Sequence, residues 1–199
     1  MYTTPTRRLL TALAATAAVV LPATGTAVAA PTPHPVTAAP ARALLHPVAD
    51  LSAQRLATAD LVAAAKFGTD SPIDDPAREA QVLDAVAAQA KELGTDPDAV
   101  RAVFRDQIEA NKLVQRTLFQ RWTDHPEQAP TTRPDLAVIR VEINRITTAL
   151  VQSLADTAPD RATALCRPAR ALATVRVIHE RRLDHLHTEA LARSLNSVC

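Results

Sequence analysis

Residues 48–67 read VADLSAQRLATADLVAAAKF, and this stretch indicates the fold class. It contains no glycine or proline, and most of its apolar side chains are alanine and leucine, which are strong helix formers. Two cations, Arg55 and Lys66, interrupt it eleven residues apart. At about 100° of rotation per residue, eleven steps return a helix to within roughly 20° of its starting direction. Both cations therefore share one face, and burying that face requires an anionic partner.

Helix signals continue along the rest of the chain. Asp75-Pro76 and Asp96-Pro97 each combine an N-cap residue with proline at the first helical position. Past residue 29, glycine occurs only at positions 68 and 94, where apolar periodicity stops. We predict helices over residues 44–67, 76–93, 97–122 and 135–154, then a last helical region up to residue 199 that breaks near Pro168. The predicted fold class is all-α, a bundle of five to six helices.

Apolar residues at helical spacing predict which faces of the later helices are buried. For the helix expected over residues 135–154, the predicted buried stripe is Leu136, Ile139, Ile143, Ile146 and Leu150. For the last helical region, the apolar positions are Leu172, Val175, Leu183 and Leu186.

The first 29 residues have the pattern of a cleavable secretory signal peptide. Arg7 and Arg8 precede an apolar run, residues 9–21, that is short for a membrane-spanning helix, and Ala27-Val28-Ala29 matches a small-residue cleavage site. The paired arginines leave both the general (Sec) and the twin-arginine (Tat) export routes open. Residues 30–45, rich in Pro, Ala and Thr, predict a linker, and residues 46–199 predict one domain.

Charge and cysteine content narrow the classes of function. The leader holds two of the 22 Lys and Arg residues and none of the 21 Asp and Glu residues, leaving 20 basic against 21 acidic. Such a balance gives no basic field for nucleic acid or a membrane surface. In an exported protein, two cysteines, Cys166 and Cys199, favour one intramolecular disulfide over metal ligation. We interpret His179, His185 and His187 as solvated, because they lack the spacing of a helical zinc site.

Three amide side chains recur every four residues at Gln107, Asn111 and Gln115, which predicts one polar stripe on a helix. Taken alone, a solvated surface explains this stripe about equally well. Together with the cations of the two preceding helices, however, it presents groups suited to a small dianion. Guanidinium and ammonium groups would bind carboxylates, and neutral amides would supply hydrogen bonds.

The ordered set of these residues resembles the all-helical chorismate mutases, in their secreted (gamma) subclass. The resemblance spans nearly the whole predicted domain and rests on Arg55, Lys66, the segment Asp75-Pro-Ala-Arg78-Glu79, Asn111, Gln115, Arg140, Cys166 and Cys199. It implies an exported isomerase of aromatic amino acid biosynthesis that rearranges chorismate to prephenate without a covalent intermediate, a cofactor or a metal. It also implies a possible homodimer, with no nucleic-acid partner and no membrane partner after leader cleavage.

The resemblance further implies a role for each residue. The arginines would clamp the two carboxylates of chorismate, Lys66 and Gln115 would donate to its ether oxygen, and Asn111 would support a carboxylate. Glu79 and the main chain near Asp75 would hold the ring hydroxyl. The implied catalytic set is Arg55, Lys66, Arg78 and Gln115, and the implied substrate-binding set is Asp75, Glu79, Asn111 and Arg140.

Two alternatives remain open at this point. A degenerate relative would keep the bundle but only bind an anionic metabolite, and a non-enzymatic secreted bundle would pair its cations with Asp and Glu. Convergence of the implied catalytic side chains and Arg140 on one cavity distinguishes an enzyme from such a bundle.

Overall fold

The computed structural model describes residues 45–199, and every regular element in this part of the chain is helical. The α-helices are α1 (His46–Lys66), α2 (Pro76–Glu92), α3 (Pro97–Asp124), α4 (Leu136–Asp156), α5 (Ala158–Arg161), α6 (Cys166–Arg181) and α7 (His185–Ser194), with 3₁₀ segments η1 (Pro126–Gln128) and η2 (Asn196–Val198). The all-α class is confirmed, whereas the expected count of five to six helices is too low. The expected signal peptide, and the linker up to residue 44, lie outside the described residues.

The aspartates predicted to start the helices do cap them in the structure. The Asp75 carboxylate accepts a hydrogen bond from the Arg78 amide at 3.0 Å, so it caps α2. Asp96 and Asp135 cap α3 and α4 in the same way. Gly94 has a φ of +68° just after α2, the left-handed conformation that glycine adopts without a steric penalty. These caps explain why the predicted starts of the three helices agree with the observed starts to within one residue.

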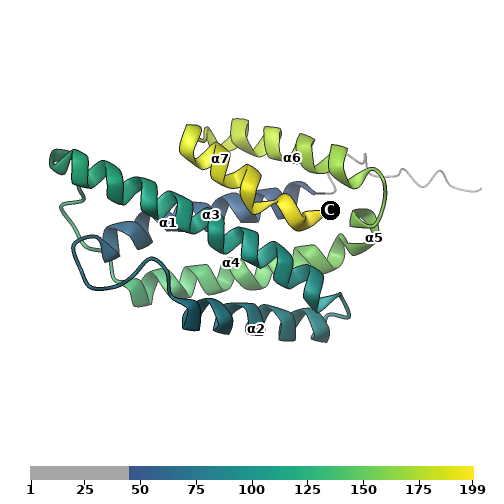
Figure 1. Cartoon of the computed structure of the whole chain (residues 1–199). Coiled ribbons are helices and arrows are strands. Elements are labelled where there is room, and N and C mark those ends of the chain that lie inside the picture. Colours follow the sequence, from purple (N-terminus) through teal and green to yellow (C-terminus); the bar gives the residue numbers. More distant parts are fainter. Residues whose placement is uncertain (1–44) are drawn as a thin grey trace, which may run out of the picture. The chain divides into compact units, whose positions relative to one another are not determined.

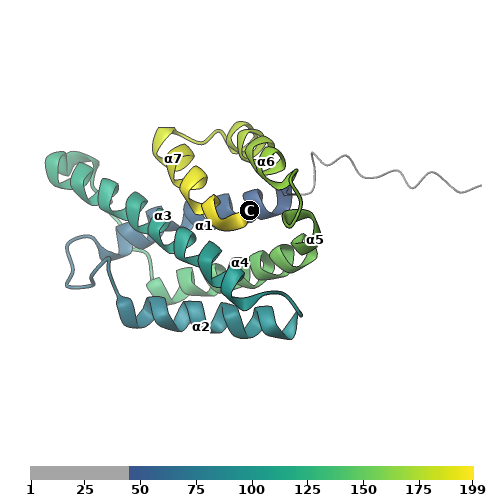
Figure 2. The same ribbon diagram turned by 45° about the vertical axis from the view of Figure 1, so that its right-hand side comes forward.

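Helix α1 lies at the centre of the bundle and packs against α3, α4, α6 and α7. In Figures 1 and 2, α2 runs along one side of α3 and α4, and α6 and α7 lie on the opposite side. Because neighbours surround α1, its buried residues do not form a single stripe. Helix α2 packs mainly against α3 and α4, and its Val86 and Ala90 belong to the same hydrophobic core as residues of α6 and α7.

The last helical region differs from the prediction in two respects. Leu172 and Val175 are exposed, while Ala173 and Val177 face the core, where α6 packs on α1. The chain also breaks a second time at Arg182, which ends α6 with a φ of +50°. Neither glycine nor proline marks this break, but Asp184, the N-cap of α7, is a helix-start signal that the prediction did not use. In α4 the predicted stripe is correct at Ile139, Ile146 and Leu150, and Leu136 and Ile143 are partly buried.

The predicted disulfide is present between Cys166 and Cys199, which are 33 residues apart. It connects the first residue of α6 to the end of the chain and so holds the C-terminal helices together. Within residues 45–199, no helix combines the length and the apolar character that a bilayer crossing requires.

His187 fastens the turn between α6 and α7 to α1. Its Nδ1 lies 2.8 Å from the carboxylate of Asp184, the residue that caps α7, and its Nε2 lies 3.3 Å from the carboxylate of Asp60 on α1. The side chain is only 15 % exposed, so the interpretation of His187 as solvated is wrong. The hydrogen bond with Asp60, supported by Asp184 and opposed by burial, raises the pKa of His187 to about 9.

We expect stability to depend on the charge of His187. Because the folded pKa of about 9 exceeds the unfolded value, the stabilisation is complete below the unfolded pKa and is lost as pH rises through about 9. The partner carboxylates are largely exposed, so we expect a contribution of about 1–2 kcal/mol. Urea unfolding of wild type and His187→Gln across this pH range measures it, with the exposed His179→Gln as control. Identical pH dependence in wild type and His187→Gln would contradict the prediction.

Candidate active site

A cavity of about 470 Å³ lies between α1, α2, α3 and α4. All eight residues that the sequence assigned to a catalytic or substrate-binding role line it: Arg55, Lys66, Asp75, Arg78, Glu79, Asn111, Gln115 and Arg140. They come from four helices and the loop before α2. The five side chains whose convergence distinguishes an enzyme from a bundle with paired cations therefore meet at one cavity.

Arg55 forms the buried part of this cavity. Only 6 % of the residue is exposed, and one guanidinium nitrogen donates to the carbonyl of Gln107 at 3.2 Å. The guanidinium also lies 5.8 Å from the centre of the Phe104 ring. Burial lowers the pKa of Arg55 to about 10, and no acidic residue among residues 45–199 forms an ion pair with it. Arg55 is thus a buried cation whose charge lacks a protein counterion in the described structure, a costly arrangement unless a ligand supplies one.

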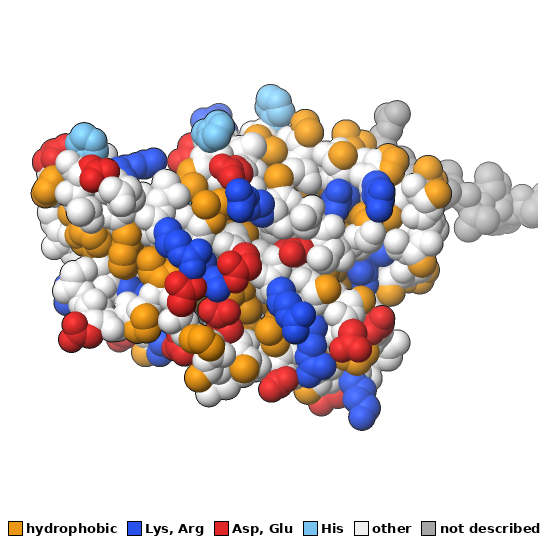
Figure 3. Space-filling model, in the orientation of Figure 1, with side chains coloured by type: hydrophobic (Ala, Val, Ile, Leu, Met, Phe, Trp, Pro, Cys, Tyr) orange, Lys and Arg blue, Asp and Glu red, His pale blue; other side chains and the backbone are white. Residues whose placement is uncertain are grey.

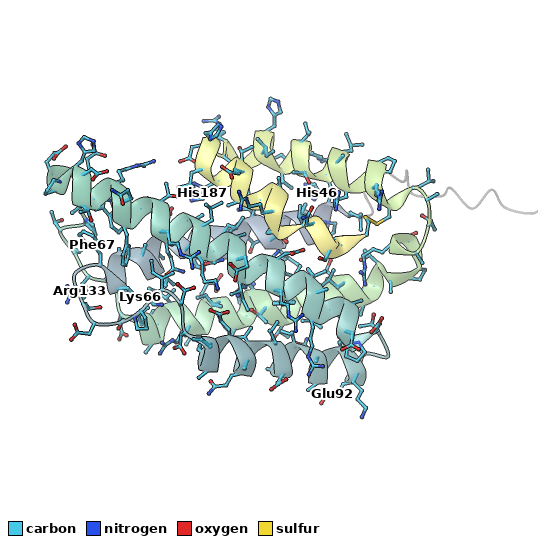
Figure 4. The ribbon with its side chains drawn as sticks, viewed as in Figure 1. His46, Lys66, Phe67, Glu92, Arg133 and His187 are labelled. Atoms are coloured by element: carbon cyan, nitrogen blue, oxygen red, sulfur yellow. A yellow bond between two sulfur atoms is a disulfide. The ribbon has the colours of Figure 1, made fainter. Side chains whose placement is uncertain are left out.

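Lys66 is the last residue of α1 and lies beside the loop that leads to α2, as Figure 4 shows. Its ammonium donates to the carbonyl of Pro72 at 2.7 Å. Burial lowers the pKa of Lys66, and nearby Arg140 acts in the same direction, while Asp75 opposes both. The loop therefore holds the ammonium at the cavity, where it remains a strong donor.

The outer part of the cavity combines exposed arginines with a helix N-terminus. Arg78 and Glu79 lie in the first turn of α2, and Arg140 lies in α4. The positive end of the α2 dipole adds to the two exposed guanidinium groups and favours an anion at this entrance. Charge is therefore positive both at the buried end and at the mouth.

Two amide side chains of α3 carry polar atoms without partners. Asn111 Nδ2 and Gln115 Oε1 are buried and unbonded, as is Arg55 Nε. Of the five such atoms among residues 45–199, these three belong to residues that line the cavity. Because buried polar groups are normally hydrogen-bonded, this concentration indicates a site built for a polar ligand.

The predicted polar stripe of α3 is wrong in one member. Gln107 is fully buried and does not line the cavity; its amide nitrogen donates to the Ser52 hydroxyl at 2.8 Å and to the Ser194 carbonyl at 3.0 Å. Its spacing is that of the stripe, but α7 packs over this part of α3. Gln107 instead supports Arg55 through its main-chain carbonyl.

Sequence reasoning also missed a fifth basic residue, Lys112, which lines the cavity and is only 8 % exposed. It follows Asn111 directly and lies in an ordinary charged helix, so no local pattern distinguished it. The apolar wall was missed too: Val62, Val82, Val86, Ile108, Leu136 and Ile143 line the cavity from four helices.

The charged and apolar residues that line the cavity indicate which kind of ligand it can bind. Five basic and two acidic side chains line it, so the cavity carries an excess of positive charge and is suited to an anionic ligand. The apolar wall suits a compact ring, while the unbonded Asn111 Nδ2 suits an acceptor and the unbonded Gln115 Oε1 suits a donor on the ligand. In Figure 3, acidic and basic side chains gather between α3 and the start of α2.

Comparison with known proteins agrees with this geometry. Residues 48–116 match the family described as chorismate mutase type II. A secreted chorismate mutase of Mycolicibacterium smegmatis is 40 % identical over 168 residues, which cover 84 % of this chain and 92 % of the relative. Another, from Mycobacterium tuberculosis, is 32 % identical over 175 residues, covering 85 % of each chain. The crystal structure of a chorismate mutase from Burkholderia phymatum superposes with a TM-score of 0.75 at 37 % identity, covering 80 % of this chain and 98 % of that one.

Proposed function

Because the chain belongs to the type II chorismate mutase family and acts as an exported chorismate mutase, we propose that the cavity between α1, α2, α3 and α4 is its active site. There it binds chorismate as a dianion and accelerates its rearrangement to prephenate. The observation that carries this assignment is Arg55, a buried guanidinium that lines the cavity and has no carboxylate partner among residues 45–199. A carboxylate of the substrate supplies the missing counterion.

The reaction requires positioning and charge stabilisation. One C–O bond of the substrate breaks while one C–C bond forms within the same molecule, so no covalent intermediate or cofactor enters the proposal. The arginines Arg55, Arg78 and Arg140 clamp the two carboxylates and hold the reacting carbons close together. Binding in this compact geometry brings the substrate close to the transition state, in which the C–O bond breaks as the C–C bond forms.

Negative charge develops on the ether oxygen as the C–O bond breaks. Lys66 and Gln115 donate hydrogen bonds to that oxygen, and they stabilise the transition state more than the ground state. Asn111 Nδ2 is an unbonded donor at the cavity and is therefore available to an oxygen atom of the ligand. Gln115 would donate through its amide nitrogen, because its unbonded Oε1 can only accept a hydrogen bond. Asn111 supports a carboxylate, and Glu79 with the main chain near Asp75 receives the ring hydroxyl.

We further propose that the mature protein comprises residues 46–199 behind a short linker, after removal of residues 1–29. The secreted relatives support a location outside the cytoplasm. The leader directs export by the Sec or the twin-arginine route. Each protomer has a complete cavity from its own helices, so a homodimer, if formed, is not needed to supply these residues.

The decisive experiment follows the absorbance of chorismate in the presence of the purified mature protein. We expect the absorbance to fall catalytically and prephenate to accumulate in equal amount. A protein that is stabilised thermally by chorismate but leaves its absorbance unchanged would be a binding protein only. If chorismate neither stabilised the protein nor was turned over, the assignment of the cavity as its binding site would be overturned.

A further inference from the structure

Lys112 of α3 is a buried cation at the edge of the active site that the proposed chemistry does not use. Only 8 % of the residue is exposed, and it lines the same cavity as Asn111 and Gln115. The long side chain runs toward the start of α2, whereas Asn111 and Gln115 have unbonded atoms available to a ligand. A buried lysine with this placement needs a specific set of partners.

Three carboxylates surround the Lys112 ammonium. Its Nζ lies 3.2 and 3.3 Å from the two oxygens of Glu79, 3.3 Å from Asp74 Oδ1 and 2.5 Å from Glu109 Oε1. Burial is the largest influence and lowers the pKa of Lys112, but the three carboxylates together raise it above the ordinary value. The ammonium therefore stays charged and holds all three groups.

Two of these partners flank the part of the site assigned to the ring hydroxyl. Asp74 immediately precedes Asp75, and Glu79 lies in the first turn of α2. Asp75 itself caps α2 through the amide of Arg78. The Lys112 ammonium thus contacts Asp74 before Asp75 and Glu79 after it. The second contact also restrains the Glu79 carboxylate.

We propose that Lys112 is a positioning residue, which orients the Glu79 carboxylate and the main chain next to Asp75 to receive the ring hydroxyl of the substrate. It does so without touching the reacting atoms. The inference rests on the proposed function, because the role of Glu79 belongs to that proposal. Burial distinguishes this contact from ordinary surface ion pairs, which contribute little.

Arg116, one turn further along α3, provides a matched comparison. Like Lys112, it pairs with Asp74, at 2.6 Å, but it does not contact Glu79. Its side chain is half exposed and does not line the cavity. Loss of Arg116 removes one anchor of the loop and leaves Glu79 held. Loss of Lys112 frees Glu79 and weakens the same loop.

The test compares Lys112→Met with Arg116→Met, each purified as the full mature chain. For chorismate, we expect kcat/KM to fall by about 10- to 100-fold in Lys112→Met, the range known for residues that orient a metal ligand, and by less than about 3-fold in Arg116→Met. With a chorismate analogue that lacks the ring hydroxyl, Lys112→Met should stay within about 3-fold of wild type. A merely structural role would lower turnover of both substrates alike.

A double-mutant cycle with Glu79→Gln adds an independent readout. If Lys112 acts through Glu79, Lys112→Met should cost less than about 3-fold when introduced into Glu79→Gln. Equal losses for the two substrates, or full additivity in the cycle, would overturn the inference. If Lys112→Met does not fold, the same comparisons are made with Lys112→Leu, which also removes the donor. A loss below about 2-fold there also overturns the inference. Wild-type turnover is measured first, so failure of the proposed function would be recognised separately.

Discussion

Lys66→Ala is expected to lower kcat for chorismate by about 10²–10³-fold, the usual cost of removing one preorganised donor from a site of charge development. The ammonium lies at the end of α1, is half-buried and is held at the cavity by the carbonyl of Pro72. In the proposed mechanism it stabilises the ether oxygen as the C–O bond breaks. Alanine removes both the positive charge and the hydrogen bond, so the loss should appear mainly in kcat.

The matched control for this prediction is Lys91→Ala. Lys91 also lies in the last turn of its helix, α2, but it is exposed and does not line the cavity. Steady-state kinetics should therefore show an unchanged kcat for Lys91→Ala. If Lys66→Ala retained more than about a tenth of wild-type kcat, Lys66 would not be the donor that the mechanism requires.

Gln115→Glu is expected to turn a nearly flat pH profile into one that favours acid. A glutamine amide donates at any pH, so wild-type kcat should change little from mildly acidic to mildly basic conditions. A carboxyl donates only when protonated, and a carboxylate at this position would repel the developing negative charge. We therefore expect activity of Gln115→Glu to fall as pH rises through the pKa of the new carboxyl, with a loss of about 10²-fold in mildly basic solution.

The pH profile of kcat across this range tests the idea directly. Gln128→Glu, in the exposed segment η1, introduces the same charge away from the cavity and should keep the wild-type profile. A wild-type rate that declines steeply above neutral pH would show that another titrating group controls the reaction. A Gln115→Glu profile parallel to wild type would remove Gln115 from contact with the ether oxygen.

The helices that carry the site were predictable because their signals are local. Asp75 and Asp96 cap α2 and α3 with their own side chains, and the following prolines suit the first helical turn. The spacing of Arg55 and Lys66 places them on one face of any helix. These features depend on residues within a few positions of each other, so no knowledge of the rest of the fold was needed.

Features that depend on packing were not predictable in the same way. Arg182 adopts a left-handed conformation without glycine, next to a turn that His187 fastens to Asp60 more than a hundred residues away. Val175 points outward although it continues an apolar pattern, because α6 turns Ala173 and Val177 toward the core instead. In both cases distant contacts outweigh the local preference.

The chain's local chemistry was sufficient to establish the helical class, the caps, the pairing of Cys166 with Cys199 and the side chains suited to a dianion. Which of those side chains share a cavity depends on how four helices cross, and this is a property of the packed core. Packing removed Gln107 from the predicted stripe by covering it with α7, and it brought Lys112 against Glu79. The physical reason is that capping acts over one helical turn, whereas burial and ion pairing depend on neighbours that only the folded chain brings together.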